Sequence, residues 1–115
     1  MATGTWEPNK VLLWTNPSPT SSFGAQTVPL DLSGYSTVLV ISKNSTDSAN
    51  TMSFYTYCKV GLSTRIDIPI FFNNSFLVRT RTITVKSNGI EFSDATQNGV
   101  SIVSLMPWYI YGIRA

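Results

Sequence analysis

The chain has 115 residues, of which 43% are hydrophobic and 12% are charged, and its formal net charge is +2. This length suits a single domain with one hydrophobic core. Charged residues make up about a quarter of an ordinary domain, so the low charge predicts a surface rich in serine, threonine and asparagine. The eight lysines and arginines are scattered along the chain, which excludes the basic patch of a nucleic-acid-binding protein.

Residues 1–9 are expected to form an arm ahead of a domain that spans residues 10–115. Gly4 and Pro8 interrupt regular structure, and Trp6 has no periodic apolar neighbours. The arm is either a disordered start or an anchor in which Trp6 inserts into a partner or a neighbouring copy. No charged-then-apolar signal peptide is present, and no apolar run reaches the ~18 residues of a membrane span, so we expect neither export by that route nor membrane insertion.

Alternating apolar and polar residues and the many β-branched side chains predict short strands and no helix. Residues 10–15 form a first strand, and residues 26–32 form an edge strand because Pro29 cannot donate to a ladder. Residues 35–43 form a core strand, since residues 38–41 are continuously apolar and thus covered on both faces. Further strands are expected at 51–60, 65–72, 101–105 and 107–113, with residues 93–99 as a polar loop.

Two of these strands alternate clearly enough to assign each side chain to a face. The residues assigned to the core face are Met52, Phe54, Cys58, Val60, Ile66, Ile68, Ile70 and Phe72. The opposite face then carries several aromatic residues and most of the charges of these strands.

A hairpin over residues 76–92 is the stretch around which we expect the fold to be organised. Asn88-Gly89 is a strong signal for a type I′ turn, because both central residues need positive φ. With these two residues as the loop, the predicted pairs are Ser87–Ile90, Lys86–Glu91 and Val85–Phe92. Alternation then places four apolar residues on the core face, namely Ile83, Val85, Ile90 and Phe92, while Lys86 and Glu91 form a cross-strand charge pair on the other.

Arg79 and Arg81 share the parity of the core residues in this hairpin. Either the end of the strand leaves the core there, or the arginines pair across an interface. We favour the first interpretation.

Together, about eight short strands separated by turns predict an all-β, single-domain antiparallel β-sandwich or jelly roll. The chain shows no internal repeat and no domain linker.

The available chemistry favours a protein that is not an enzyme. Histidine, the commonest general base and metal ligand, is absent. Cys58 is the only cysteine, so it can form neither an intrachain disulfide nor a zinc site alone. We expect no catalytic residue, no metal ligand and no cofactor. A carboxylate pair assembled by folding and a calcium site near Asp47 or Asp94 are minor alternatives.

The remaining functional signal is aromatic. Five side chains fall on strand faces opposite to the inferred core, namely Tyr55, Tyr57, Phe71, Tyr109 and Tyr111. They line an interface between copies, where Tyr is enriched, or form a platform on which sugars stack, or belong to the core because the second sheet covers them. With Trp6, they are the candidate interface or ligand surface.

Several motifs in this order resemble a β-rich module of bacteriophage tail and baseplate proteins, notably of phages that infect Gram-positive bacteria. Residues 13–41 (LWTNPSPTSSFGAQTVPLDLSGYSTVLVI) are similar to its opening. Residues 81–85 (RTITV) with 89–92 (GIEF) resemble its middle hairpin, and residues 107–114 (PWYIYGIR) resemble its closing strand. The resemblance covers nearly the whole chain.

The resemblance implies a virion structural protein, made in the host cytoplasm, at a tail tip, baseplate or fibre end. Its implied partners are other copies of the chain, with a trimer favoured, other virion proteins and a host cell-surface glycan. The family supplies no catalytic residues. Two alternatives are a capsid decoration or head-fibre protein that binds other virion proteins, and a carbohydrate-binding module of a cell-wall enzyme.

Overall fold

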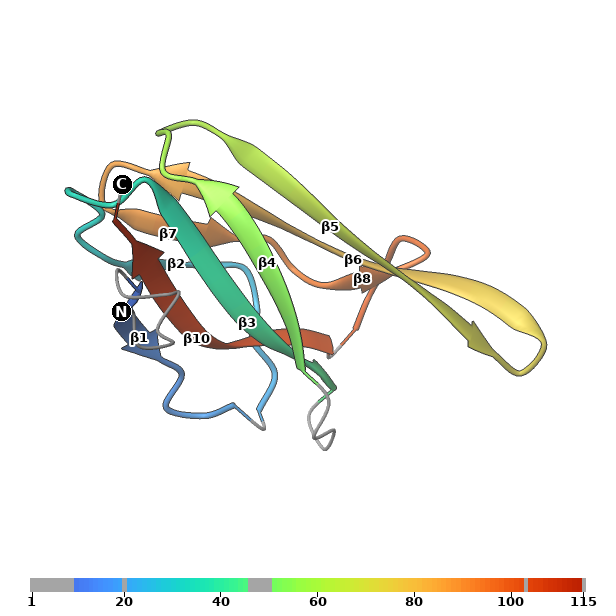
Figure 1. The fold of residues 1–115 in the computed structure, drawn as a ribbon. Helices are drawn as coiled ribbons and strands as arrows, with labels where there is room; N and C mark the ends of the chain where they lie inside the picture. The colour runs from blue at the N-terminus through green and yellow to red at the C-terminus, as the bar shows by residue number, and fades with distance from the viewer. Residues whose placement is uncertain (1–9, 20, 46–50, 103, 115) are drawn as a thin grey trace, which may run out of the picture.

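The computed structural model describes residues 10–19, 21–45, 51–102 and 104–114, and these contain strands and no helix. Two antiparallel sheets pack together (Figure 1), which confirms the predicted all-β sandwich. Within the described residues the strands are β1 (Lys10–Thr15), β2 (Gln26–Pro29), β3 (Thr37–Ser45), β4 (Thr51–Tyr57), β5 (Ser63–Phe72), β6 (Ser75–Lys86), β7 (Gly89–Phe92), β8 (Thr96–Gln97), β9 (Val100–Ser101) and β10 (Ser104–Ile113).

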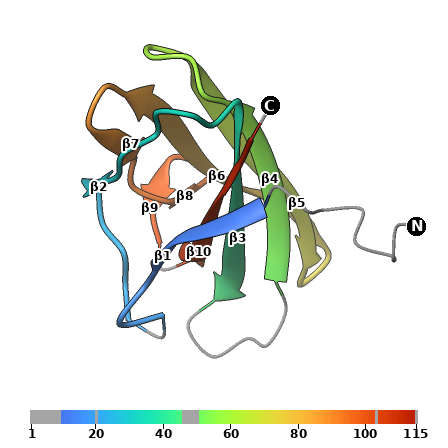
Figure 2. The same cartoon turned by 60° about the vertical axis from the view of Figure 1, so that its left-hand side comes forward.

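Among the described residues, the first and last strands lie next to each other in one sheet. Sheet A has the order β1-β10-β3-β4. Sheet B has the order β2-β7-β6-β8-β9. In addition, β5 pairs with β6 along most of its length, from Ser75 to Thr84. Figure 2, turned by 60° about the vertical axis, shows β2 and β7 of sheet B on one side of the molecule and β3 and β4 of sheet A on the other. β4 and β5 are edge strands of different sheets, so the sandwich has an open seam between them.

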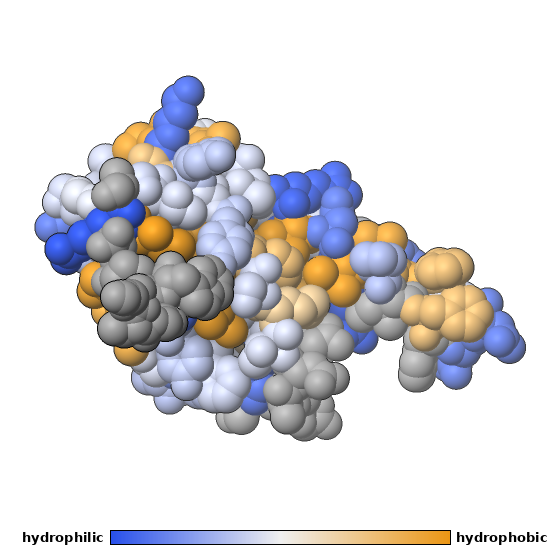
Figure 3. All heavy atoms as spheres, in the orientation of Figure 1, coloured by the Kyte–Doolittle hydropathy of each residue, from blue (hydrophilic) through white to orange (hydrophobic). Residues whose placement is uncertain are grey.

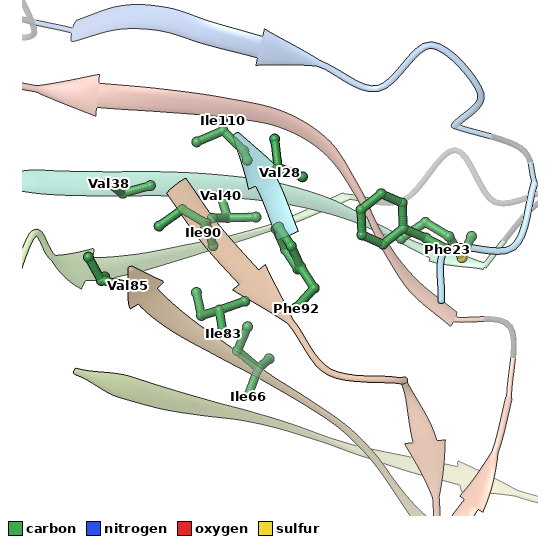
Figure 4. Close-up of a cluster of buried hydrophobic side chains, with 11 residues drawn as sticks. Phe23, Val28, Val38, Val40, Ile66, Ile83, Val85, Ile90, Phe92 and Ile110 are labelled. Carbon is green, nitrogen blue, oxygen red and sulfur yellow. The ribbon is translucent and has the colours of Figure 1, made fainter. Parts of the chain in front are cut away.

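The core lies between the two sheets and is aliphatic with two phenylalanines (Figure 4). Its buried members are Phe23, Val28, Val38, Val40, Ile66, Ile83, Val85, Ile90, Phe92, Met106 and Ile110. The four core-face residues predicted for the hairpin are all among them. Phe23 belongs to the loop between β1 and β2, and its ring lies edge-on to Trp14 and Phe92, at centroid distances of 6.0 and 5.2 Å.

The predicted core strand is confirmed in β3. Val38 and Val40 are fully buried in the core, and Leu39, on the outer face, is only 4% exposed. Leu39 is paired with Tyr111 on one side and Tyr55 on the other, so flanking tyrosines help to cover it.

The register predicted for the hairpin is wrong. The loop is Ser87-Asn88, and the pairs are Lys86–Gly89, Val85–Ile90, Thr84–Glu91 and Ile83–Phe92. This pairing differs from the predicted one by two residues. Because an even shift keeps every side chain on its own face, the four residues predicted for the core face are still correct. Lys86 and Glu91 still meet, at 3.7 Å, as a diagonal contact between partly exposed side chains.

The turn differs from the predicted one because Gly89 packs closely against the backbone of β2. A Cβ built on this glycine would lie 2.0 Å from the carbonyl oxygen of Val28 in β2, and its φ is 154°. Gly89 is therefore a strand residue at the closest approach of β2, paired with Pro29, and not the second residue of the turn.

Other strand limits differ from the prediction where prolines and turns intervene. β4 ends at Tyr57, so Val60 is 64% exposed in a turn instead of lying in the core. The predicted loop at 93–99 contains β8. The two closing strands expected around Pro107 are one continuous strand, β10, with a register shift between Pro107 and Tyr109, which is a position that tolerates proline.

The hairpin of β5 and β6 forms an arm that projects from the body of the sandwich (Figure 1). Asn73 and Asn74, both with positive φ (51° and 59°), form its two-residue turn. The molecule measures 49 × 33 × 24 Å and has a radius of gyration of 14.9 Å, against roughly 13 Å for a compact domain of this length. The shape is therefore elongated.

Candidate interaction surfaces

Four of the predicted tyrosines share the outer face of sheet A. The register aligns Leu12, Tyr111, Leu39 and Tyr55 in one row across β1, β10, β3 and β4. Tyr109 lies in the row on one side and Tyr57 in the row on the other. We call the residues Leu12, Tyr55, Tyr57, Tyr109 and Tyr111 the aromatic face.

The aromatic face is open to solvent mainly over β4. Tyr55 is 55% exposed and Tyr57 is 72% exposed, whereas Tyr109 and Tyr111 are half-buried. The interpretation of Tyr55 and Tyr57 as core residues covered by the second sheet is therefore wrong, because sheet B packs on the opposite side of sheet A. Their role as an interface or a ligand platform stays a prediction.

Rings line up along β10 and have a lysine near each end. Trp108 stacks on Tyr109 with centroids 4.9 Å apart and an interplanar angle of 18°, and Tyr109 lies 6.3 Å from Tyr111. Lys10 Nζ is 4.6 Å from the centroid of Tyr111, and Lys43 Nζ is 5.4 Å from that of Trp108. These cation–π contacts help to hold the rings of β10 in place, so the part of the aromatic face on β10 is preorganised.

A hollow of about 540 Å³ opens beside the aromatic face, at the seam between β4 and β5. Its lining combines rings, hydroxyls and one aliphatic side chain, contributed by Thr37, Tyr55, Thr56, Tyr57, Leu62 and Thr64. The hydroxyls of Thr56 and Thr64 are 2.9 Å apart and join the two edge strands. Flat apolar surface with hydroxyl groups at hand is suited to a neutral polar ligand such as a sugar.

Phe71 does not join the tyrosines. It lies near the end of the arm and is paired with Phe76, and their ring centroids are 5.1 Å apart. Both are exposed, at 63% and 74%, so Phe71 is not a core residue either. The remaining candidate, Trp6, lies outside the residues that the structure describes.

The favoured interpretation of the hairpin arginines is wrong at Arg81, because the strand does not leave the core there. Arg81 is 2% exposed. Its Nη1 donates to the carbonyl oxygen of Ser93 at 2.7 Å and its Nη2 to that of Phe23 at 2.9 Å. Burial lowers the pKa of Arg81 to about 10, against the opposing effect of the Asp94 carboxylate, so the guanidinium is charged at neutral pH. Arg79, partly buried, donates from Nε to Gln97 Oε1 at 3.1 Å.

Described carboxylates accept short hydrogen bonds within the fold, and Asp94 Oδ1 accepts one from the distant amide of Ala25 at 2.8 Å. Asp31 accepts from the amide and hydroxyl of Ser33, and these bonds lower its pKa. Asp67 accepts from the hydroxyl of Thr80 at 2.7 Å and from Arg65 Nε at 2.9 Å, and the pKa of Asp67 is lowered for that reason. Among the described residues, no three His, Cys, Asp or Glu side chains gather as metal ligands.

Burial raises the pKa of the Cys58 thiol. A raised pKa disfavours the thiolate, which is the nucleophilic and metal-binding form. Cys58 packs against the core from a half-buried position, as the sequence predicted for a small apolar residue.

Comparisons of the chain with protein-family models, curated proteins and solved structures give no match. Over the described ranges, no helix is long and apolar enough to span a bilayer. Two surfaces of the described structure are candidate sites of interaction, namely the aromatic face with its hollow and the end of the β5–β6 arm.

Proposed function

We propose that this protein is a structural component of a bacteriophage virion, a module at the tail tip, baseplate or fibre end that serves host-surface attachment or assembly. The observation that carries the proposal is the aromatic face, where tyrosines from β4 and β10 lie on one side of a rigid sheet and two of them are more than half exposed. Grouped exposed aromatic residues are typical of binding surfaces. The resemblance of the sequence motifs to phage tail modules gives the setting.

A rigid face with a neutral hollow suits weak binding of a host-surface glycan. Tyr55 and Tyr57 offer ring faces and hydroxyls next to Thr37 and Thr64. Attachment proteins act in several copies on one particle, so a modest affinity at each site is multiplied by avidity.

Two further candidates are each favoured by one feature. The exposed apolar end of the arm, with Phe71 and Phe76, favours a decoration or head-fibre protein that binds other virion proteins. The hollow beside Tyr57 favours a carbohydrate-binding module of a cell-wall enzyme.

Binding of the purified protein to cell walls from a panel of Gram-positive bacteria tests attachment. We expect Tyr55→Ala with Tyr57→Ala to weaken binding at least tenfold, because ring contacts are worth about 1 kcal/mol each. The matched control is Val100→Ala, which truncates a residue of β9 that is 67% exposed. Equal binding by the double variant and the control contradicts the role of the aromatic face.

Location is tested by electron microscopy of phage particles that carry this gene, labelled with antibodies against the protein. Label at the tail end is the expected result. Label on the capsid supports the decoration alternative, and particles without label contradict a virion role altogether.

A further inference from the structure

The outer edge of β4 is the least protected sheet edge among the described strands. Proteins usually shield an open edge with a bulge, a proline, charged side chains or a very short strand. β1 has a register shift between Leu12 and Trp14, β2 ends in Pro29, and β9 has only two residues. β5 contains Pro69 and charged side chains. β4 (TMSFYTY) has no proline, no charged side chain and no register shift in its pairing with β3.

The backbone groups on the open edge of β4 belong to alternate residues. Just beyond β4, the amide of Cys58 donates to the carbonyl oxygen of Ser36 at 2.9 Å, on the β3 side. In an antiparallel pair, residues with both backbone groups directed at the partner alternate with residues whose groups are directed away from it. The register of β3 and β4 therefore directs the N–H and C=O groups of Ser53 and Tyr55 towards the open edge.

β5 borders this edge at one end only. The two strands meet at Thr56 and Thr64, whose hydroxyls are 2.9 Å apart. From there β5 follows β6 into the projecting arm and diverges from β4 (Figure 1). Between Thr51 and Tyr55, no described strand pairs with the outer edge of β4.

The inner side of the seam is apolar and incompletely covered. Phe54 of β4 and Ile68 of β5 both pack against the core cluster and are half-buried. Met52, which shares the inner face of β4 with Phe54, is also half-buried. Figure 3, in the orientation of Figure 1, shows hydrophobic surface between the body and the projecting arm. The core is thus open to solvent at the seam.

We propose that the edge of β4 from Thr51 to Tyr55 binds an extended peptide segment of another protein, which adds a strand to sheet A. The free N–H and C=O groups of alternate residues are matched by an extended backbone. Every second side chain of the added strand faces Phe54 and Ile68. Those side chains are apolar, because a charged or polar group buried there without a partner is costly.

The size of the edge favours a peptide over a second folded copy. The stretch from Thr51 to Tyr55 extends for about 17 Å, and with a depth of ~10 Å it offers roughly 170 Å². A stable interface between folded proteins takes ~800 Å² from each partner. A peptide needs less, because main-chain hydrogen bonds supply affinity and its inward side chains fill the seam.

Selection from a displayed library of random peptides, with the full chain as the target, is the first test. We expect the enriched peptides to carry apolar residues at alternate positions. Ser53→Pro should weaken their binding about tenfold or more, because it removes an N–H from the open edge and places a ring there. Ser53→Ala keeps the N–H and is the matched control, which should bind like the wild type. No enriched peptide, or equal binding by the two variants, overturns the proposal.

A second pair of variants covers the case in which the proline disturbs the fold, which thermal unfolding of each variant reveals. In Met52→Lys the ammonium group reaches solvent in the free protein, but an added strand buries it. We expect this variant to lose peptide binding and Met52→Leu to retain it. Unchanged binding by Met52→Lys contradicts a strand at this edge.

Amide hydrogen exchange of the full chain with a selected peptide locates the contact. We expect slower exchange at Ser53 and Tyr55, since an added strand pairs with their amides. Protection at Leu62 alone would place the peptide in the hollow and overturn the proposal.

Light scattering of the free protein tests a second copy as the occupant. A dimer that Ser53→Pro dissociates would show that two β4 edges pair with each other, and it would also overturn the proposal. Because these measurements use neither cell walls nor phage particles, this proposal and the proposed function fail separately.

Discussion

At the scale of single residues, Arg81 shows how a charge is accommodated between the sheets. Its guanidinium joins β6 to two loops through the carbonyl oxygens of Ser93 and Phe23, and it lies 5.6 Å from the centre of the Phe23 ring. Charge-assisted bonds to buried carbonyls are stronger than neutral ones. Arg81 therefore positions Phe23, whose ring closes one end of the core.

We expect Arg81→Ala to lower the free energy of unfolding by about 3 kcal/mol, because it removes two charge-assisted hydrogen bonds and leaves two carbonyl groups without them. Arg81→Lys should recover only part of this loss, since an ammonium group lacks the planar fork. Urea denaturation measures both. Arg65→Ala is the control and should change stability by less than about 1 kcal/mol, because its ion pair with Asp67 is exposed. Equal effects of Arg65→Ala and Arg81→Ala contradict the structural role of Arg81.

Asp67 gives stability a dependence on pH. Hydrogen bonds from Thr80 and Arg65 hold the pKa of Asp67 below its ordinary value of 3.8. The folded protein therefore binds this proton less readily than the unfolded chain, so the stabilisation is present above pH 3.8 and is lost as the pH falls through the lower folded pKa. We expect the difference in unfolding free energy between the wild type and Asp67→Asn to shrink over that acid range. Urea midpoints of both proteins at a series of pH values measure this difference. A difference that stays constant with pH contradicts the stabilising role of the Asp67 carboxylate.

At the scale of elements, strand contacts and not turn propensity decide the register of β6 and β7. Asn-Gly is the preferred pair for a two-residue hairpin loop. Here β2 packs its backbone against Gly89, and the amide of Leu30 donates to the carbonyl oxygen of Asn88 at 3.0 Å. The glycine is needed in the strand, so the turn moves back by one residue to Ser87-Asn88.

Gly89→Ala should be more damaging than a similar change at a glycine in open space. We expect a loss of about 3 kcal/mol or more at Gly89, where the new Cβ meets the backbone of β2, against about 1 kcal/mol for Gly99→Ala. Gly99 also has a positive φ, of 86°, but a Cβ there has no atom within 4 Å. Thermal unfolding of the two variants measures their loss of stability. A similar loss in both variants contradicts the close contact of Gly89 with β2, because β2 would then move aside without cost.

At the scale of the whole molecule, a compact sandwich carries a projecting arm, and the two parts have different surfaces. The body presents hydroxyls, charges and the aromatic face. The arm presents exposed phenylalanines. The two parts therefore offer different kinds of surface to a partner.

Removal of residues 1–9 tests the predicted division between this N-terminal segment and the domain that begins at Lys10. Every member of the core cluster lies between Phe23 and Ile110, so we expect the chain that begins at Lys10 to unfold cooperatively, within about 1 kcal/mol of the full chain. If Trp6 is an anchor, incorporation into particles fails while cell-wall binding survives. Loss of cooperative unfolding shows instead that residues 1–9 belong to the fold, and normal incorporation excludes the anchor.

The sequence alone predicted the all-β class, the position of most strands and the core faces of the hairpin, because period-2 alternation is a local property of the chain. It also assigned the tyrosines of β4 and β10 to strand faces opposite the inferred core, and left open whether a second sheet covers them. It did not predict that they share one face while Phe71 lies apart from them, because strand order joins β10 to β3 and places β5 in the other sheet.

Tertiary structure alone decided the features that depend on residues far apart in the chain. The register at Gly89 depends on Val28, and the burial of Arg81 depends on Phe23, which is 58 residues away. Alternation assigns a side chain to a face, but only the packing of two sheets and their loops determines whether that face is covered, and by which groups. For this reason alternation assigned Arg81 to a face without identifying its carbonyl partners, and it identified the apolar residues of the arm without showing that they project into solvent.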